Sequence, residues 1–103
     1  MQEIDRIQKM EKALNELSAS QKSVSEALEN FAKHQEQLSE LSEYYGSESF
    51  HHDLALDEAG KLPADLKRGV LSEDAVYDLI TDLKELADEL HQSADTILRL
   101  ITK

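Results

Sequence analysis

The chain has 103 residues and a formal net charge of −11, from 22 acidic and 11 basic residues, and it contains no cysteine. This length fits one domain, and the negative charge argues against direct binding to nucleic-acid phosphates. No segment approaches the roughly 18 apolar residues of a membrane-spanning helix, so no membrane partner is expected. Because disulfides cannot form and the N-terminal sequence MQEIDRIQKMEK lacks the apolar region of a signal peptide, we expect a cytoplasmic location.

The first predicted element is a helix over residues 3–45. Helix-forming residues dominate the composition, and neither Pro nor Gly interrupts this segment. Mostly apolar side chains recur at every seventh position in two rows that lie three residues apart. The rows are Ile7, Leu14, Gln21, Leu28, Gln35 and Ser42, and Met10, Leu17, Val24, Phe31, Leu38 and Tyr45. Such a strict heptad repeat is typical of a left-handed coiled coil, in which the helix needs a partner.

Two glutamines, Gln21 and Gln35, interrupt the first row two heptads apart. They are either tolerated polar positions that slightly weaken the interface, or residues that pair across it. In the second case they would set the register or the number of helices. The sequence leaves both interpretations open.

A short helix and a loop are predicted in the middle of the chain. Gly46 can end the first helix, because glycine readily takes the left-handed conformation that closes a helix. Ser47 is a suitable N-cap for a short helix over 47–57. Pro63, together with the nearby glycines, predicts a loop over 58–71.

The last predicted helix covers residues 73–102 and begins after Ser72, a good capping residue. Its apolar side chains form a stripe roughly 120° wide when they are projected on a helix. They are Val76, Leu79, Ile80, Leu83, Leu86, Ala87, Leu90, Ala94, Ile97, Leu98 and Ile101. This stripe is wider than the interface of a two-stranded coiled coil and suits a helix between two neighbours.

These elements predict an all-α fold in a single helical domain, residues 1–103. The two long helices are expected to form an antiparallel, coiled-coil-like hairpin, with the short helix folded over the turn. Pairing of two hairpins into a four-helix bundle would bury the wide stripe, so a homodimer is expected. A three-helix monomer, or a free face that binds a different protein, is the alternative.

The sequence offers little that resembles a catalytic or metal site. His51, His52 and Asp53 form the one cluster with metal-binding side chains, but adjacent residues point about 100° apart on a helix, whereas ligands on one face are spaced by three or four. No cysteine nucleophile, serine elbow or phosphate-binding glycine loop occurs. We therefore expect no metal, no cofactor and no enzymatic activity.

Three basic residues, Lys61, Lys67 and Arg68, lie close together in the predicted loop of this otherwise acidic chain. They can counter the acidic helix ends nearby, or they can contact an anionic group or an acidic partner surface. The sequence does not separate these two roles.

Four strings carry a resemblance to a known family: IDRIQKME at 4–11, YYGS at 44–47, DEAGKLP at 57–63 and LKRGVLSEDAVYDL at 66–79. Together they resemble the bacterial domain of unknown function 4298, common in streptococci and other Firmicutes, over nearly the whole chain. Members usually have a Trp in the short middle helix, where Phe50 stands here. The resemblance implies a bacterial cytoplasmic protein and implies no activity.

The resemblance also directs attention to residues 44–79, although backbone geometry alone could demand this loop sequence. We expect a helical protein–protein interaction module or adaptor that acts through its turn region and apolar helix face on an unidentified partner protein. The alternative is an acidic inhibitor that mimics nucleic acid in a basic channel. The candidate partner-binding residues are Tyr44, Tyr45, Phe50, Asp57, Glu58, Lys61, Lys67, Arg68 and Tyr77.

Overall fold

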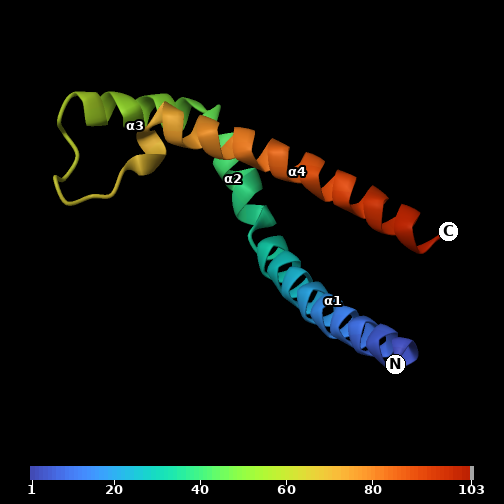
Figure 1. Cartoon of the computed structure of the whole chain (residues 1–103). Helices are drawn as coiled ribbons and strands as arrows, with labels where there is room; N and C mark the ends of the chain where they lie inside the picture. The colour runs from blue at the N-terminus through green and yellow to red at the C-terminus, as the bar shows by residue number, and fades with distance from the viewer. Residues whose placement is uncertain (103) are drawn as a thin grey trace. The chain divides into compact units, whose positions relative to one another are not determined.

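Helices account for nearly all of the secondary structure in the computed structural model, which describes residues 1–102 apart from the side chain of Glu73 (Figure 1). In chain order the elements are α1 (Gln2–Ala32), α2 (Gln35–Tyr45), α3 (Glu48–Glu58), the 3₁₀ helix η1 (Gly69–Leu71) and α4 (Glu73–Ile101). No strand occurs among the described residues, so the predicted all-α class is confirmed. By its internal contacts the chain divides into unit 1, Met1–Glu43, and unit 2, Tyr44–Lys103.

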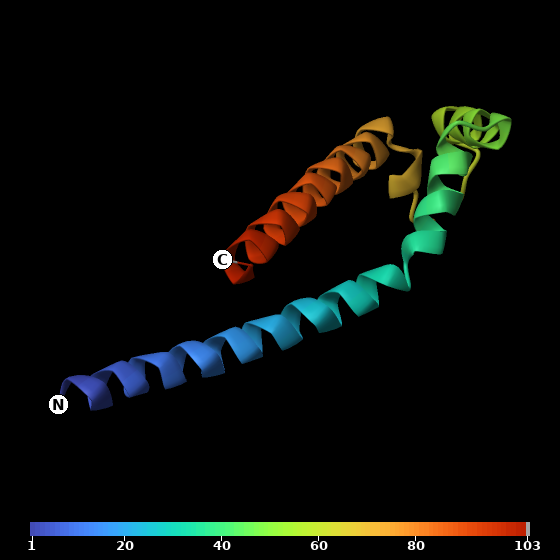
Figure 2. The same ribbon diagram turned by 90° about the vertical axis from the view of Figure 1, so that its right-hand side faces the viewer.

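The helix expected over 3–45 is divided into α1 and α2, and the chain bends between them at Lys33 and His34 (Figure 2). The ring Nδ1 of His34 lies 3.0 Å from the carbonyl oxygen of Asn30, which the backbone N–H of His34 would bind in a continuous helix. That N–H donates instead to the carbonyl oxygen of Phe31, at 2.9 Å. Because an Nδ1–H of the side chain competes for the i−4 acceptor, the backbone tightens to an i−3 bond and the helix bends.

The heptad rows of α1 lie on the surface of that helix. The exposed fractions of the aliphatic and Met side chains in these rows run from 44% at Leu28 to 70% at Leu17. No residue of α1 is buried. The apolar face that the sequence predicts is therefore present and uncovered, and its pairing with another helix stays a prediction.

Unit 2 contains the buried core of the described residues. Its members are Phe50 from α3, Leu71 from η1 and Val76 from α4. Phe50 is only 1% exposed and is the largest fully buried side chain. The 3₁₀ helix η1 contacts both α3 and α4 and so connects the two helices that carry the other core residues.

Local signals define both ends of α3. The Ser47 hydroxyl accepts a hydrogen bond from the backbone N–H of Phe50 at 3.2 Å, as expected of an N-cap. At the other end Gly60 has a φ of 68°, and the N–H of Lys61 donates to the carbonyl of Leu56 while the N–H of Gly60 donates to that of Asp57. This pattern is a Schellman motif, in which a glycine in the left-handed region satisfies the last carbonyls of a helix.

The helix α4 begins at the predicted cap, since the Ser72 hydroxyl accepts a hydrogen bond from the N–H of Ala75 at 3.3 Å. Its apolar stripe is covered only near this end, where Val76 is buried and Ile80 and Leu83 are half-buried. The later stripe residues are exposed. Within residues 1–102, no helix has both the length and the apolar character needed to cross a membrane.

Candidate functional site

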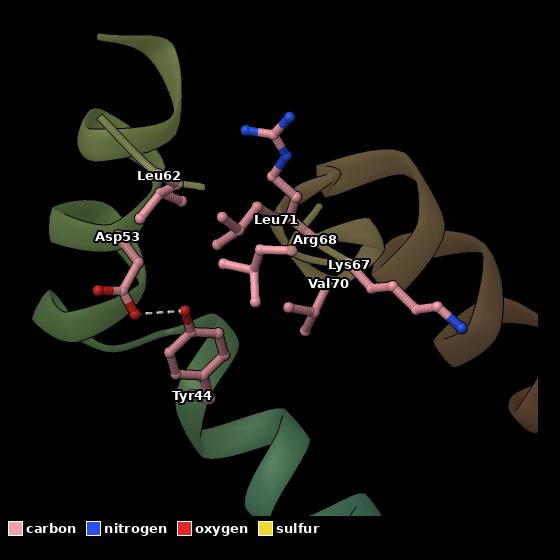
Figure 3. Close-up of a pocket in the computed structure, with 8 residues that line it drawn as sticks. Tyr44, Asp53, Leu62, Lys67, Arg68, Val70 and Leu71 are labelled. Atoms are coloured by element: carbon pink, nitrogen blue, oxygen red, sulfur yellow. Dashed lines mark hydrogen bonds between the residues drawn. The ribbon is translucent and has the colours of Figure 1, made fainter. Parts of the chain in front are cut away.

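A pocket of about 290 Å³ lies on unit 2 (Figure 3). It is built by the end of α2, by α3, by the loop that follows α3 and by η1. Its lining combines aliphatic side chains with one phenol, one carboxylate and two basic groups. The lining residues are Tyr44, Asp53, Leu62, Leu66, Lys67, Arg68, Val70 and Leu71.

Phe50 forms the core beneath this pocket. Its ring packs edge-on against Tyr44, with centroids 5.6 Å apart and planes at 88°, and it is tilted against Tyr45 at 5.2 Å. The ring of His51 lies 5.6 Å away. Ser47 connects the two helices that carry these rings, because its hydroxyl donates to the carbonyl of Tyr44 at 2.7 Å and also caps α3. The aromatic cluster thus holds the end of α2 against α3.

The Tyr44 hydroxyl donates a hydrogen bond to Oδ2 of Asp53 at 2.6 Å, which Figure 3 shows at one wall of the pocket. This hydrogen bond to the carboxylate, followed by desolvation and the negative charge of Asp53, raises the pKa of Tyr44 above its ordinary value. The phenol is therefore neutral and directed at Asp53. The pair joins α2 to α3 and gives the pocket a polar wall of defined geometry.

An ion pair joins the loop that follows α3 to that helix. The Arg68 guanidinium donates to Oδ1 of Asp57 at 2.7 Å, and both side chains are partly exposed. Partly exposed pairs of this kind contribute about 0–1 kcal/mol to stability. The contact fixes the position of the loop residues before η1 more than it stabilises the whole fold.

The aliphatic wall of the pocket is open to solvent. Leu66 is 47% exposed and Val70 is 40% exposed, whereas Leu71 is buried. Lys67 extends from the pocket on the side away from Asp53 (Figure 3). Among the described side chains, no carboxylate lies within ion-pair distance of its ammonium. The pocket can therefore accept an apolar group and present a positive charge beside it.

The predicted site residues fall into three groups. Tyr44, Lys67 and Arg68 line the pocket, and Asp57 accepts a hydrogen bond from Arg68. Tyr45 and Phe50 belong to the aromatic cluster that includes Tyr44, and Phe50 is buried in the core. Three exposed candidates do not line the pocket: Glu58, Lys61 and Tyr77.

Sequence reasoning missed most of the pocket wall. Leu62, Leu66 and Val70 are spaced by four residues, as on one face of a helix, but Pro63 and Gly69 interrupt the segment and predict a loop there. The sequence marks Asp53 only as part of a possible metal cluster, because its hydrogen-bond partner Tyr44 lies nine residues earlier. The one available signal was the concentration of apolar residues inside a loop, where polar residues are usual.

The histidine cluster has a structural context in α3. The ring of His51 packs on Phe50, and the carboxylate of Asp53 is bound to Tyr44. Among the side chains that the structure describes, no three of His, Cys, Asp or Glu are grouped so that they could hold a metal ion. The cluster therefore contributes packing and one hydrogen bond to the site.

No curated protein and no solved structure matches the chain. The family described as Domain of unknown function (DUF4298) matches residues 7–92. This range contains most of α1, all of α2, α3 and η1, and every residue that lines the pocket. The chain therefore belongs to the DUF4298 family.

Proposed function

We propose that the protein is a non-enzymatic interaction module, an adaptor whose pocket on unit 2 binds an apolar side chain of a partner protein. The observation that carries this proposal is the exposure of Leu66 and Val70 on a wall that surrounding contacts hold in place. Exposed aliphatic side chains that line a concave surface are a common feature of binding sites.

The contacts around the pocket support this role. Tyr44 and Asp53 fix one wall, and Arg68 and Asp57 fix the loop opposite. A surface that is already ordered loses less conformational entropy when it binds a partner. The partner side chain that fits best is aliphatic or aromatic, with a carboxylate close enough to reach the ammonium of Lys67.

A matched pair of variants tests the proposal. Leu66→Ser removes apolar surface from the pocket, whereas Leu79→Ser removes it from a residue of α4 that is 42% exposed and outside the pocket. Proteins captured by each immobilised variant and by the original chain would be compared by quantitative mass spectrometry. Circular dichroism would establish that both variants keep their helices.

We expect at least one captured protein to be lost about tenfold with Leu66→Ser and retained with Leu79→Ser, because a central apolar contact contributes about 1–2 kcal/mol. Equal capture by all three chains would show that the pocket binds no partner. Loss with both variants would point to the apolar face of α4 instead.

The acidic surface of α4 favours the second candidate, an inhibitor that occupies a basic nucleic-acid channel. Apart from Glu73, seven carboxylates of this helix are exposed: Asp74, Asp78, Asp82, Glu85, Asp88, Glu89 and Asp95. Binding of this type depends on charge, so it should weaken steeply between about 50 and 200 mM salt. Binding to a captured partner that is insensitive to salt over this range would contradict this candidate and favour the pocket.

A further inference from the structure

The uncovered heptad face of α1 calls for a partner of matching length and periodicity. The helix has 31 residues, which corresponds to about 46 Å. Both apolar rows run along it, and their aliphatic and Met side chains are between 44% and 70% exposed. A long helix with such a face is stabilised mainly by a second helix that covers it.

The polar member of the first row, Gln21, distinguishes the possible orientations of two α1 helices. In a parallel, in-register pair, Gln21 lies opposite Gln21 of the second copy, and the two amides can hydrogen-bond to each other. In an antiparallel pair centred on the same rows, Gln21 lies opposite Leu17, and the buried amide has no partner. A buried amide without a hydrogen bond is costly, so Gln21 favours the parallel pair.

The charges beside the rows favour the same orientation. In a parallel two-stranded coiled coil, the residue just before a first-row position faces the residue five positions further along the partner helix. Arg6 precedes Ile7, and Glu11 lies five positions beyond Arg6. Arg6 of each chain therefore faces Glu11 of the other, which gives two opposite-charge pairs by symmetry.

The other flanking positions of α1 introduce no repulsion, since none of them is charged. They are Ile4, Ala13, Ser18, Ser20, Ser25, Ala27 and Ala32. In the antiparallel pair of α1 helices, Arg6 and Glu11 do not meet. The charge pattern and Gln21 are independent features, and both are satisfied by one arrangement.

We propose that α1 of two copies of this chain forms a parallel, in-register, two-stranded coiled coil. The dimer would carry two copies of the unit 2 pocket. This inference goes beyond the proposed function, because it rests on residues of unit 1 that take no part in the pocket. Coverage of the same face by α4, or by an antiparallel second α1, would be a different outcome of the test below.

Engineered cysteines in the full chain test the arrangement directly, because the chain has no cysteine of its own. Met10→Cys places a thiol in the second row, and Ala19→Cys places one on the opposite face of α1 as the control. In the parallel pair the two residues at position 10 are adjacent, whereas in the antiparallel pair they lie about 27 Å apart. We expect mild oxidation to convert Met10→Cys, and not Ala19→Cys, into a covalent dimer on a non-reducing gel.

Sedimentation of the unmodified chain accompanies this test. A dimer is expected, and a monomer at all accessible concentrations would overturn the proposal. Covalent dimers from the double variant Met10→Cys/Leu28→Cys, with none from either single variant, would show the antiparallel arrangement and also overturn it.

A charge swap provides a second measurement that does not depend on oxidation. Arg6→Glu places a glutamate opposite Glu11 of the other copy at both symmetry-related pairs. The repulsion should raise the dissociation constant of the dimer about tenfold. The double variant Arg6→Glu/Glu11→Arg restores opposite charges and should return the constant to within about twofold of the original. A double variant as weak as Arg6→Glu alone would contradict the predicted register.

Discussion

The two units of this chain place their large apolar side chains in opposite situations. In unit 2, Phe50 is 1% exposed and is surrounded by aromatic neighbours from α2 and α3. In α1, Leu17 is 70% exposed, and Met10 and Val24 of the same row are 54% and 55% exposed. The difference follows from the sequences, because α1 repeats every seven residues whereas residues 44–79 contain no repeat.

A repeating face and a non-repeating segment have different uses. Each turn of a heptad face offers the same kind of contact, so it matches another helix along its whole length. A non-repeating segment can fold on itself and form one surface of particular shape, as the pocket around Leu66 and Val70 does. The two proposals accordingly place association on α1 and partner recognition on unit 2.

The largest expected effect comes from Phe50→Ala, which removes the central ring of unit 2. Loss of a buried aromatic side chain costs about 3–5 kcal/mol of unfolding free energy, and unit 2 has few other buried residues to compensate. Urea denaturation followed by tyrosine near-ultraviolet circular dichroism measures the loss. Phe50→Leu, which keeps part of the apolar volume, serves as the control and should be less damaging. An unfolding free energy unchanged by Phe50→Ala would mean that this core does not hold unit 2 together.

Gln21→Leu should have the next largest effect and the opposite sign. Replacing the amide by an apolar side chain in the α1 interface is expected to strengthen dimerisation by about 1–2 kcal/mol, roughly tenfold in the dissociation constant. The control is Gln8→Leu, which adds a similar side chain outside both rows. Sedimentation equilibrium measures the constants. Equal strengthening by both variants would show that added hydrophobicity, and not the α1 row, drives association.

Removal of the ion pair that holds the loop should cost less. Arg68→Met keeps most of the aliphatic stem and removes the bond to Asp57, so the expected loss of unfolding free energy is about 0.5–1 kcal/mol. Partner binding should weaken more than stability does, because the loop beside Leu66 loses its fixed position. A double-mutant cycle with Asp57→Asn isolates the pair, and a coupling energy of zero would show that the contact does not order the loop.

The smallest expected effect is on the ionisation of the Tyr44 phenol at high pH. Its pKa is raised by the hydrogen bond to Asp53, so the stabilisation from this bond is complete below the unfolded pKa of about 10 and is lost as the pH rises through the folded pKa. In a spectrophotometric titration of the three tyrosines, one phenol should ionise at a higher pH than the other two, which gives a late step in the titration curve. Tyr44→Phe should remove the late step, and Tyr77→Phe should leave it. A late step that survives Tyr44→Phe would assign it to another tyrosine.

The site could be predicted from the sequence only in part. Tyr44, Lys67 and Arg68 were among the candidates and do line the pocket, because their aromatic and basic character stands out in an acidic helical chain. The aliphatic wall did not stand out, since the spacing by four of Leu62, Leu66 and Val70 falls in a segment that Pro63 and Gly69 mark as a loop. Tyr77 was a reasonable candidate by residue type, yet it lies outside the pocket.

The bend at His34 shows a limit of a different kind. Periodicity and the absence of Pro and Gly both favour one continuous helix over 3–45, and the second heptad row is apolar on both sides of the bend, at Phe31 and Leu38. The interruption depends on which acceptor the imidazole of His34 binds, and the ring takes the carbonyl of Asn30 in place of the backbone N–H. Competition between a side chain and the backbone for one acceptor leaves no trace in a hydrophobic pattern.

The sequence by itself determined the features that depend on neighbours along the chain: the all-α class, the caps at Ser47 and Ser72 and the heptad face of α1. The left-handed glycine that closes a helix was expected at Gly46, and the structure has it at Gly60. Only the tertiary structure decided that Tyr44 binds Asp53 and that Phe50 packs against Tyr44 and Tyr45. It also decided that Leu66 and Val70 form an open wall. Caps and periodicity arise within one or two helical turns, whereas these contacts depend on the path that the whole of unit 2 follows in space.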